Sequence, residues 1–415
     1  MKKIFYSFVL FFIIVSKIIS VSASDSVMAR IGNNYYGSLE EALKAAGPND
    51  IISLTNNVTL KDSLEINKTV NIDLNNHNIK AKDSVFLVQG GSLNLSGKGM
   101  VFESEPNYGA VILKGSNDSN QTNYSTVTVG SDVILEGWSG IFITHENNTS
   151  HGIIVNMDGG INAVDDTNGG AGIGIYVNGN IKHENNSPII NLGKTAHISS
   201  SGDGIYSAGY ATYNIDGAYI SGKEAGLAIK SGVFNIKDGI IVGSGEDKTP
   251  TSGNNNGINP SGAAIQIESN PEYIGNIELN IENGTIQSKN SNVIYEYVVN
   301  NSNTQVKNIN ISGGKFISDS NKDVFSLSDS FKNNHKGFIS GGTYSSNPNE
   351  FLKNGYTTNK NENNLYEVIT GTISVFGFNN SNNNNIFIPF IILASIIILG
   401  IITYLNRTKI VSIFK

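Results

Sequence analysis

The sequence predicts an all-β fold: a right-handed parallel β-helix with an N-terminal capping helix, followed by one C-terminal transmembrane helix. Three observations predict it. One short phrase of alternating apolar and polar residues recurs through the middle of the chain, glycine-started apolar runs stand between its copies, and an uncharged apolar run lies near the C-terminus. A repeat of about 20–50 residues is typical of a solenoid, in which each unit packs only on its neighbours.

Residues 1–24 have the composition of a secretory signal peptide. Lys2 and Lys3 precede an apolar run from Ile4 to Ile19, and the segment closes on the small residues Val21-Ser22-Ala23. Removal of this segment near Ala23 is expected, and a retained signal anchor is the alternative. The extracellular β-helix domain is then expected to cover residues 25–370.

Residues 37–50, "GSLEEALKAAGPND", predict a short helix within Ser38 to Ala46. Ser38 and Glu41 have the spacing of a capping box, one face of the segment is apolar, and Gly47-Pro48 ends it. The open end of a solenoid exposes apolar core and unpaired strands. This helix is therefore expected to cover the end of the β-helix, before the first strand at Ile51 to Thr55.

The recurrent phrase consists of two short alternating runs around a glycine or aspartate turn. Its clearest copies are "NIDGAYIS" from Asn214, "NIKDGIIVG" from Asn235, "NIENGTIQS" from Asn280 and "NISGGKFIS" from Asn310. Alternation predicts strands with one buried face, and glycine supplies the positive φ that the corner between two strands needs. Counting the looser copies, the β-helix is expected to run from about Ile51 to about Ser346.

A second marker, a glycine that opens an apolar run, lies between the phrases. Its copies start at Gly109, Gly140, Gly174, Gly204, Gly226 and Gly262, with a variant at Asn292. Most starts lie 30 to 36 residues apart and one gap is 22, so each coil has this strand, a loop of variable length and the two-strand phrase. Other repeat and β folds fit less well. A sandwich would need hairpin signals and a propeller would need four strands per repeat. A leucine-rich repeat would need a leucine spacing that this sequence lacks.

The glycine-started strands predict a ligand-binding surface. Alternation points the first and third residues after each glycine inward and the second outward. The outward positions are Val111, Phe142, Tyr176, Tyr206, Ala228, Ala264 and Ile294. Coils stack about 4.8 Å apart, so Phe142, Tyr176 and Tyr206 are expected to form an exposed aromatic ladder suited to stacking on sugar rings. The alternative is a ladder that only stabilises the sheet surface.

Two segments carry a family resemblance. Residues 38–79, "SLEEALKAAGPNDIISLTNNVTLKDSLEINKTVNIDLNNHNI", and residues 339–356, "ISGGTYSSNPNEFLKNGY", resemble surface-anchored, pectate-lyase-like, adhesin-like right-handed β-helix proteins of gut Firmicutes. The resemblance spans nearly the whole ectodomain but rests on structural motifs. It implies the fold and a bacterial cell-surface location far more than an activity.

An enzymatic role is the main alternative to binding, as a polysaccharide lyase or a glycoside hydrolase with a non-standard site. The resemblance directs attention to an arginine base beside acidic calcium ligands, but the chain has only Arg30, before the capping helix, and Arg407. Hydrolysis needs paired acids, and Asp165-Asp166 is the only adjacent pair of aspartates in the coils. We interpret that pair as a solvated turn and expect no catalytic residues and no cofactor; calcium has no EF-hand-like spacing to hold it.

The tetrapeptide "HENN" occurs twice, in loops of neighbouring coils. His145, Glu146, His183 and Glu184 are the weak candidates for a divalent metal site, because two imidazoles and two carboxylates can bind such an ion. Duplication of a polar loop explains the recurrence equally well, and no metal is expected.

The C-terminal region predicts a membrane anchor. Residues 371–385 are an Asn-rich linker, and Ile386 to Leu405 is uncharged and long enough to cross a bilayer. Arg407, Lys409 and Lys415 lie in a tail of residues 406–415 that is expected in the cytoplasm. The net charge of −7 gives no electrostatic reason for a nucleic-acid partner, and the absence of cysteine leaves burial and backbone pairing to hold the ectodomain.

We therefore expect a single-pass cell-surface protein with an adhesin-like binding or structural role, in which glycans or other cell-surface ligands are the possible partners. A purely structural stalk is the further alternative. The acid, arginine and histidine content argues against the enzyme, and the aromatic ladder favours the binder over the stalk.

Overall fold

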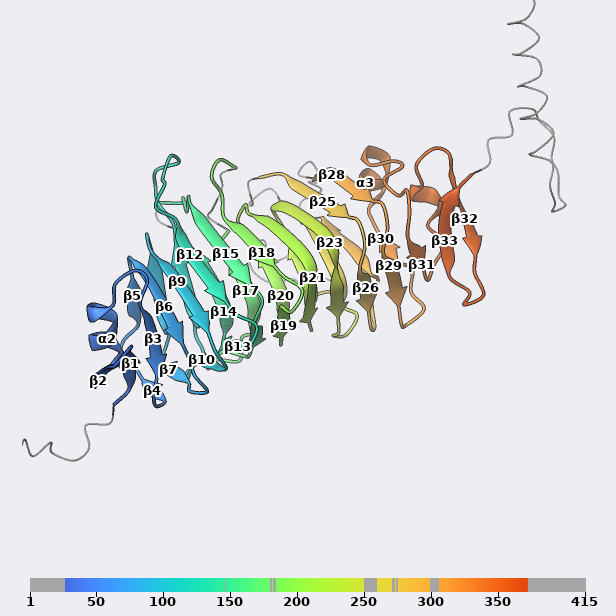
Figure 1. The fold of residues 1–415 in the computed structure, drawn as a ribbon. Helices are drawn as coiled ribbons and strands as arrows, with labels where there is room; N and C mark the ends of the chain where they lie inside the picture. Colours follow the sequence, from blue (N-terminus) through green and yellow to red (C-terminus); the bar gives the residue numbers. More distant parts are fainter. Residues whose placement is uncertain are drawn as a thin grey trace, which may run out of the picture. The chain divides into compact units, whose positions relative to one another are not determined.

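The fold is largely β, and its strands pair in parallel, coil upon coil (Figure 1). The computed structural model describes residues 27–145, 147–179, 181, 184–249, 260–270, 273, 275–298 and 306–371. Within these residues the strands form two parallel sheets that stack in register, an arrangement consistent with a parallel β-helix. The predicted signal peptide, linker, transmembrane segment and tail lie outside the described residues. No helix of the described part is long and apolar enough to cross a membrane.

The glycine-started strands form one of the two sheets, of ten strands. Each pairs in parallel with its counterpart in the next coil, from Glu65↔Leu87 to Tyr295↔Ser326. In spatial order they are β5 (Leu64–Ile66), β8 (Phe86–Gln89), β11 (Val111–Lys114), β14 (Ser139–Thr144), β17 (Ile173–Val177), β20 (Asp203–Ser207), β22 (Ala225–Ile229), β24 (Ala263–Ser269), β27 (Ile294–Val298) and β30 (Phe325–Ser326).

The recurrent phrase forms the other sheet, as two parallel columns of strands. The column of first runs contains β3 (Ile51–Leu54), β6 (Thr69–Asp73), β9 (Ser92–Ser96), β12 (Ser125–Val129), β15 (Ile153–Met157), β18 (Ile189–Leu192), β25 (Ile277–Ile281) and β28 (Val306–Ile311). The column of second runs contains β4 (Val58–Thr59), β7 (Ile79–Ala81), β10 (Gly99–Glu103), β13 (Val133–Gly137), β16 (Gly160–Ala163), β19 (His197–Ser200), β26 (Thr285–Ser288), β29 (Lys315–Ser318) and β31 (Thr343–Tyr344). The long strands β21 (Thr212–Gly222) and β23 (Gly232–Gly243) contribute to both columns.

In four coils, close packing at a corner of the core leaves no room for a side chain on the opening glycine. A Cβ on Gly174 would lie 2.4 Å from the Ile198 side chain and 2.3 Å from the Gly204 carbonyl oxygen of the next coil. Gly140, Gly204 and Gly226 meet a core isoleucine and, in the last two, a backbone carbonyl in the same way. The side chains removed from water by this arrangement form one continuous apolar core along the coils.

The predicted phase of the glycine-started strands is wrong in three coils. The observed register pairs Ile112 with Phe142, Ala228 with Gln266, and Gln266 with Tyr295. Ile112, Gln266 and Tyr295 therefore occupy the outward column in place of the predicted Val111, Ala264 and Ile294, and those three lie buried in the core. The reason is that Ala110, Ala264 and Val293, not Gly109, Gly262 and Asn292, fill the corner position that Gly140 and Gly226 occupy in their coils.

The first letter of the recurrent phrase builds a ladder of asparagine amides on the outer face of the second sheet. Asn191 donates from Nδ2 to Asn156 Oδ1, Asn214 to Asn191, Asn235 to Asn214, and Asn280 to Asn235, at 2.9 to 3.1 Å. Each amide is both donor and acceptor, so an identical residue in successive coils satisfies its neighbours, as in other stacked parallel strands. This explains why one side chain is repeated at that position.

The two ends of the parallel stack differ from its body. Helix α2 (Leu39–Ala45) lies at the N-terminal end beside the antiparallel strands β1 (Ala29–Ile31) and β2 (Asn34–Tyr36) (Figure 1). Ser38 accepts from the Glu41 backbone N–H at 3.2 Å as predicted, whereas Glu41 accepts from Gly37 and not from Ser38. Leu39, Ala42 and Leu43 are buried, which confirms the predicted apolar face.

At the C-terminal end, parallel pairing stops at β31. Strand β33 (Tyr366–Thr370) pairs antiparallel with both β31 and β32 (Tyr356–Lys360). Short helices α3 (Asp329–Asn334) and η1 (Asn349–Phe351) precede this hairpin and bury Phe331 and Phe351. The parallel part thus runs from β3 to β31, close to the limits predicted at Ile51 and Ser346.

Candidate functional site

Three aromatic rings stand in register on the outer face of the glycine-started sheet. Phe142 pairs with Tyr176 and Tyr176 with Tyr206 in successive coils. The Phe142 and Tyr176 rings stack with centroids 4.6 Å apart, and the Tyr176 and Tyr206 rings with centroids 5.1 Å apart. The predicted ladder therefore exists and lies outside the main core.

The predicted exposure of the ladder is wrong for Tyr206, which is 2% exposed. Tyr273, from a loop 67 residues further along the chain, brings its hydroxyl to 3.3 Å from that of Tyr206. The two rings and neighbouring apolar side chains form a small second core on the outside of the sheet. Phe142 and Tyr176 remain partly exposed.

Trp138 extends the exposed part of the ladder, and sequence reasoning did not identify it. Its ring lies 5.6 Å from Tyr176 and 6.3 Å from Phe142, centroid to centroid. The indole N–H donates to the Ala171 carbonyl at 3.0 Å, which fixes the ring orientation. We call Trp138, Phe142 and Tyr176 the aromatic shelf. Trp138 directly precedes β14, two residues before Gly140, which is the only signal of its position in the sequence.

A buried carboxylate anchors the shelf to the preceding coil. Glu103 accepts from the Trp138 backbone N–H at 2.9 Å and from the N–H groups of Asn107 and Tyr108 at 3.3 Å each. Burial raises the pKa of Glu103, while these backbone hydrogen bonds lower it. Glu103 thus ties together Trp138 and the loop that presents Tyr108, which is 51% exposed.

The shelf can stack on a ring but offers no reactive group. Burial, and secondarily Tyr273, raises the pKa of Tyr176 to about 12, so its hydroxyl is neutral at physiological pH. Aromatic faces give about 0.5–1.5 kcal/mol per stacked pair beyond the area they bury. A flat apolar ligand face would therefore bind weakly to one ring and more firmly across several.

The described residues considered for catalysis or metal binding either form hydrogen bonds within loops or are exposed. Asp166 accepts from the backbone N–H groups of Asn168 at 2.7 Å and Gly170 at 2.8 Å, so it forms a turn, and Asp165 is exposed. His145 Nδ1 accepts from the Asn148 N–H at 3.2 Å, and Glu184 accepts from Asn276 at 2.8 Å. Glu146 and His183 lie outside the described residues. Among described residues, no three His, Asp or Glu side chains form a group suited to a metal ion.

Two further carboxyl groups lie beside the small second core, and sequence reasoning missed them. Asp203 is 1% exposed, and its Oδ2 atom has no hydrogen-bond partner within the described structure. Burial, and then the neighbouring Glu224, raises the pKa of Asp203 well above its usual range, while Lys230 lowers it. Glu224 has a raised pKa for the same first reason. Asp203 immediately precedes the coil-opening Gly204, where no other coil-opening glycine has an acid.

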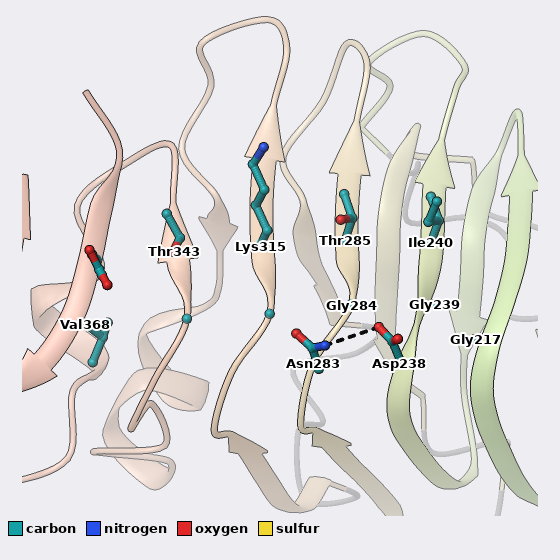
Figure 2. Close-up of a pocket in the computed structure, with 13 residues that line it drawn as sticks. Gly217, Asp238, Gly239, Ile240, Asn283, Gly284, Thr285, Lys315, Thr343 and Val368 are labelled. Carbon is teal, nitrogen blue, oxygen red and sulfur yellow. Dashed lines mark hydrogen bonds between the residues drawn. The ribbon is translucent and has the colours of Figure 1, made fainter. Parts of the chain in front are cut away.

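The structure also contains an open groove of about 620 Å³, which lies along the turns between the two strands of the recurrent phrase. Its floor is a column of glycines with φ between 98° and 140°, among them Gly217, Gly239, Gly284, Gly314 and Gly342. Figure 2 shows Asp238 and Asn283 facing each other beside this column, joined by a hydrogen bond of 3.3 Å. Lys315, Thr285 and Thr343 line the other side. No aromatic ring lines the groove, so it offers a sugar hydrogen bonds but no stacking face.

Comparisons with protein-family models, with curated proteins and with solved structures find no match for the chain.

Proposed function

We propose that the chain is a membrane-anchored, extracellular, right-handed parallel β-helix of adhesin type that binds a glycan on the aromatic shelf. The observation that carries the proposal is the shelf itself: rings from successive coils stacked at 4.6 Å, flanked by Trp138, and partly exposed. A repetitive polymer can contact several rings at once, so individually weak contacts add up to useful avidity.

The surface location rests on the signal-like N-terminus, the apolar Ile386 to Leu405 segment and the basic residues that follow it. The resemblance to pectate-lyase-like surface proteins supports the same location and the right-handed coil. Protease added to intact cells should release the ectodomain and leave a short C-terminal fragment. Digestion of a C-terminal tag from outside the cell would contradict the proposed orientation.

A binding experiment with matched variants tests the shelf. The whole protein, displayed on cells or purified, is applied to a glycan array, together with the double variant Phe142→Ala/Tyr176→Ala. Loss of two stacking faces should weaken binding by about 1–3 kcal/mol, or roughly 5- to 150-fold. Tyr219→Ala is the control, because Tyr219 stacks on His197 at 4.5 Å on the other sheet, away from the shelf.

A structural stalk is the second candidate, and the burial of Tyr206 favours it. In that role the ladder would only stabilise the surface of the sheet. The two roles make different predictions for the same variants. A binder loses glycan affinity in the double variant with a small change in melting temperature, whereas a stalk loses stability and never shows a ligand.

A further inference from the structure

A buried group of three polar side chains lies beside the small second core, on the outer face of the glycine-started sheet. Lys230 directly follows β22, Glu268 lies near the end of β24, and Asn270 directly follows β24. Their exposed fractions are 1%, 0% and 0%. Because Ile229 pairs with Ile267, the next residues in the two strands, Lys230 and Glu268, stand side by side in adjacent coils.

One carboxylate contacts both of the other side chains. Lys230 Nζ lies 2.9 Å from Glu268 Oε2, and Asn270 Nδ2 donates to Glu268 Oε1 at 3.2 Å. The lysine amine and the asparagine carboxamide therefore contact the two oxygens of one carboxylate, which can carry a proton between them. A carboxylate that contacts both an amine and an amide can act as the general acid and base when the amine attacks the amide carbon.

The surroundings exclude water and shield the amine. Lys230 Nζ lies 5.1 Å from the centre of the Tyr206 ring and 4.8 Å from that of Tyr273. Both rings are buried, at 2% and 4% exposure. Ionised groups are costly to bury unless their interactions recover the lost hydration, and a fully buried Lys–Glu pair is weak support for stability by itself. A reaction that consumes the lysine charge and leaves Glu268 protonated would remove the cost of both buried charges.

We propose that Lys230 and Asn270 form an intramolecular isopeptide bond with Glu268 as the acid–base catalyst. Glu268 takes a proton from the Lys230 ammonium, and the neutral Nζ attacks Asn270 Cγ. The carboxyl group passes this proton to Nδ2, the Cγ–Nδ2 bond breaks, and Glu268 takes a second proton from the attacking nitrogen. One ammonia molecule is released, an amide joins the two side chains, and Glu268 is left protonated; no oxidant, reductant or cofactor is required.

The cross-link would join two adjacent coils across a long excursion of the chain. The segment between the paired strands β22 and β24 includes β23 and the loop that follows it, and the Gly226 to Gly262 interval of 36 residues is the longest between coil-opening glycines. The chain has no cysteine, so no disulfide can close this loop. An isopeptide would provide a covalent closure that reduction cannot open.

Peptide mapping of the whole protein tests the proposal directly. Trypsin does not cleave after an acylated lysine, so residues 224–237 should remain one peptide, "EAGLAIKSGVFNIK", joined to residues 249–289. The joined pair should weigh less than the sum of its parts by one ammonia molecule, about 17 Da. Separate peptides ending at Lys230 and Lys237 would overturn the proposal, and so would a bond to Glu268 with loss of water, about 18 Da.

Variants assign the roles. Asn270→Ala and Glu268→Gln should each yield the separate peptides, and each should lower the melting temperature by several degrees. Lys237→Ala is the matched control, since Lys237 forms an exposed ion pair with Asp216, and it should retain the cross-link. A cross-link that survives Glu268→Gln would remove Glu268 from the mechanism. The map of the unaltered protein decides the main question even where a variant fails to fold.

Discussion

The close packing around the coil-opening glycines allows a quantitative prediction about stability. In Gly174→Ala the new Cβ would lie 2.3 Å from the Gly204 carbonyl oxygen and 2.4 Å from Ile198 Cγ2. The first atom belongs to the backbone of the adjacent coil, so relief requires movement of the parallel ladder. Overpacking of this kind costs about 1–3 kcal/mol, and we expect the upper end because the obstacle is backbone. With an unfolding entropy of about 2.1 cal/mol/K per residue over the described domain, about 3 kcal/mol lowers Tm by about 4 °C.

Thermal unfolding followed by circular dichroism checks this value. The control is Gly160→Ala, where the nearest atom to the new Cβ is Cγ1 of Ile134 at 3.3 Å, and that side chain is 41% exposed and free to shift. The control should change Tm by about 1 °C or less. Equal stability of the two variants would refute the corner packing and the register derived from it.

Three further predictions follow from particular residues. Asn214→Ala should cost about 1–3 kcal/mol in urea unfolding, because it removes hydrogen bonds to Asn191 and Asn235 at 2.9 and 3.1 Å; an unchanged midpoint would contradict the ladder. The pKa of Asp203 is higher in the folded protein than its value near 3.8 in the unfolded chain. The Asp203 side chain therefore makes its full contribution to stability below about pH 3.8, and this contribution is lost as the pH rises through the folded pKa. Asp203→Asn should therefore stabilise the protein at neutral pH by about 1 kcal/mol or more and flatten the pH profile; an unaltered profile would count against this. Ser38→Ala should lower the free energy of unfolding by about 1 kcal/mol, because it removes the N-cap of α2. An unchanged Tm in thermal unfolding would contradict this.

Much of the fold could be predicted because the local sequence of each repeat specifies its strands and turns. Alternation identified the strands, and the capping residues placed α2 to within a residue. The predicted phase was wrong at Gly109, Gly262 and Asn292 because alanine or valine fills the corner in those coils, and the predicted opening residue lies beside the corner. The sequence shows that asparagine recurs at one position of the phrase. That these asparagines hydrogen-bond to one another became clear only from the register of neighbouring coils.

The candidate site was less predictable because loops decide what covers a strand. The stack of Phe142, Tyr176 and Tyr206 follows from equivalent positions in successive coils. The burial of Tyr206 depends on Tyr273, 67 residues away, and no local pattern signals that contact. Trp138 joins the shelf through a hydrogen bond to Ala171, which is likewise a contact between loops.

The central claim, that the shelf binds a glycan, has a built-in reporter, because Trp138 is the only tryptophan of the chain. Its fluorescence should be recorded while the purified protein is titrated with an oligosaccharide found on the array. The account predicts a saturable change in Trp138 emission with the affinity measured by direct binding, and loss of both in Tyr176→Ala. Tight binding that leaves the emission of Trp138 unchanged and survives Tyr176→Ala would place the glycan elsewhere and contradict the account.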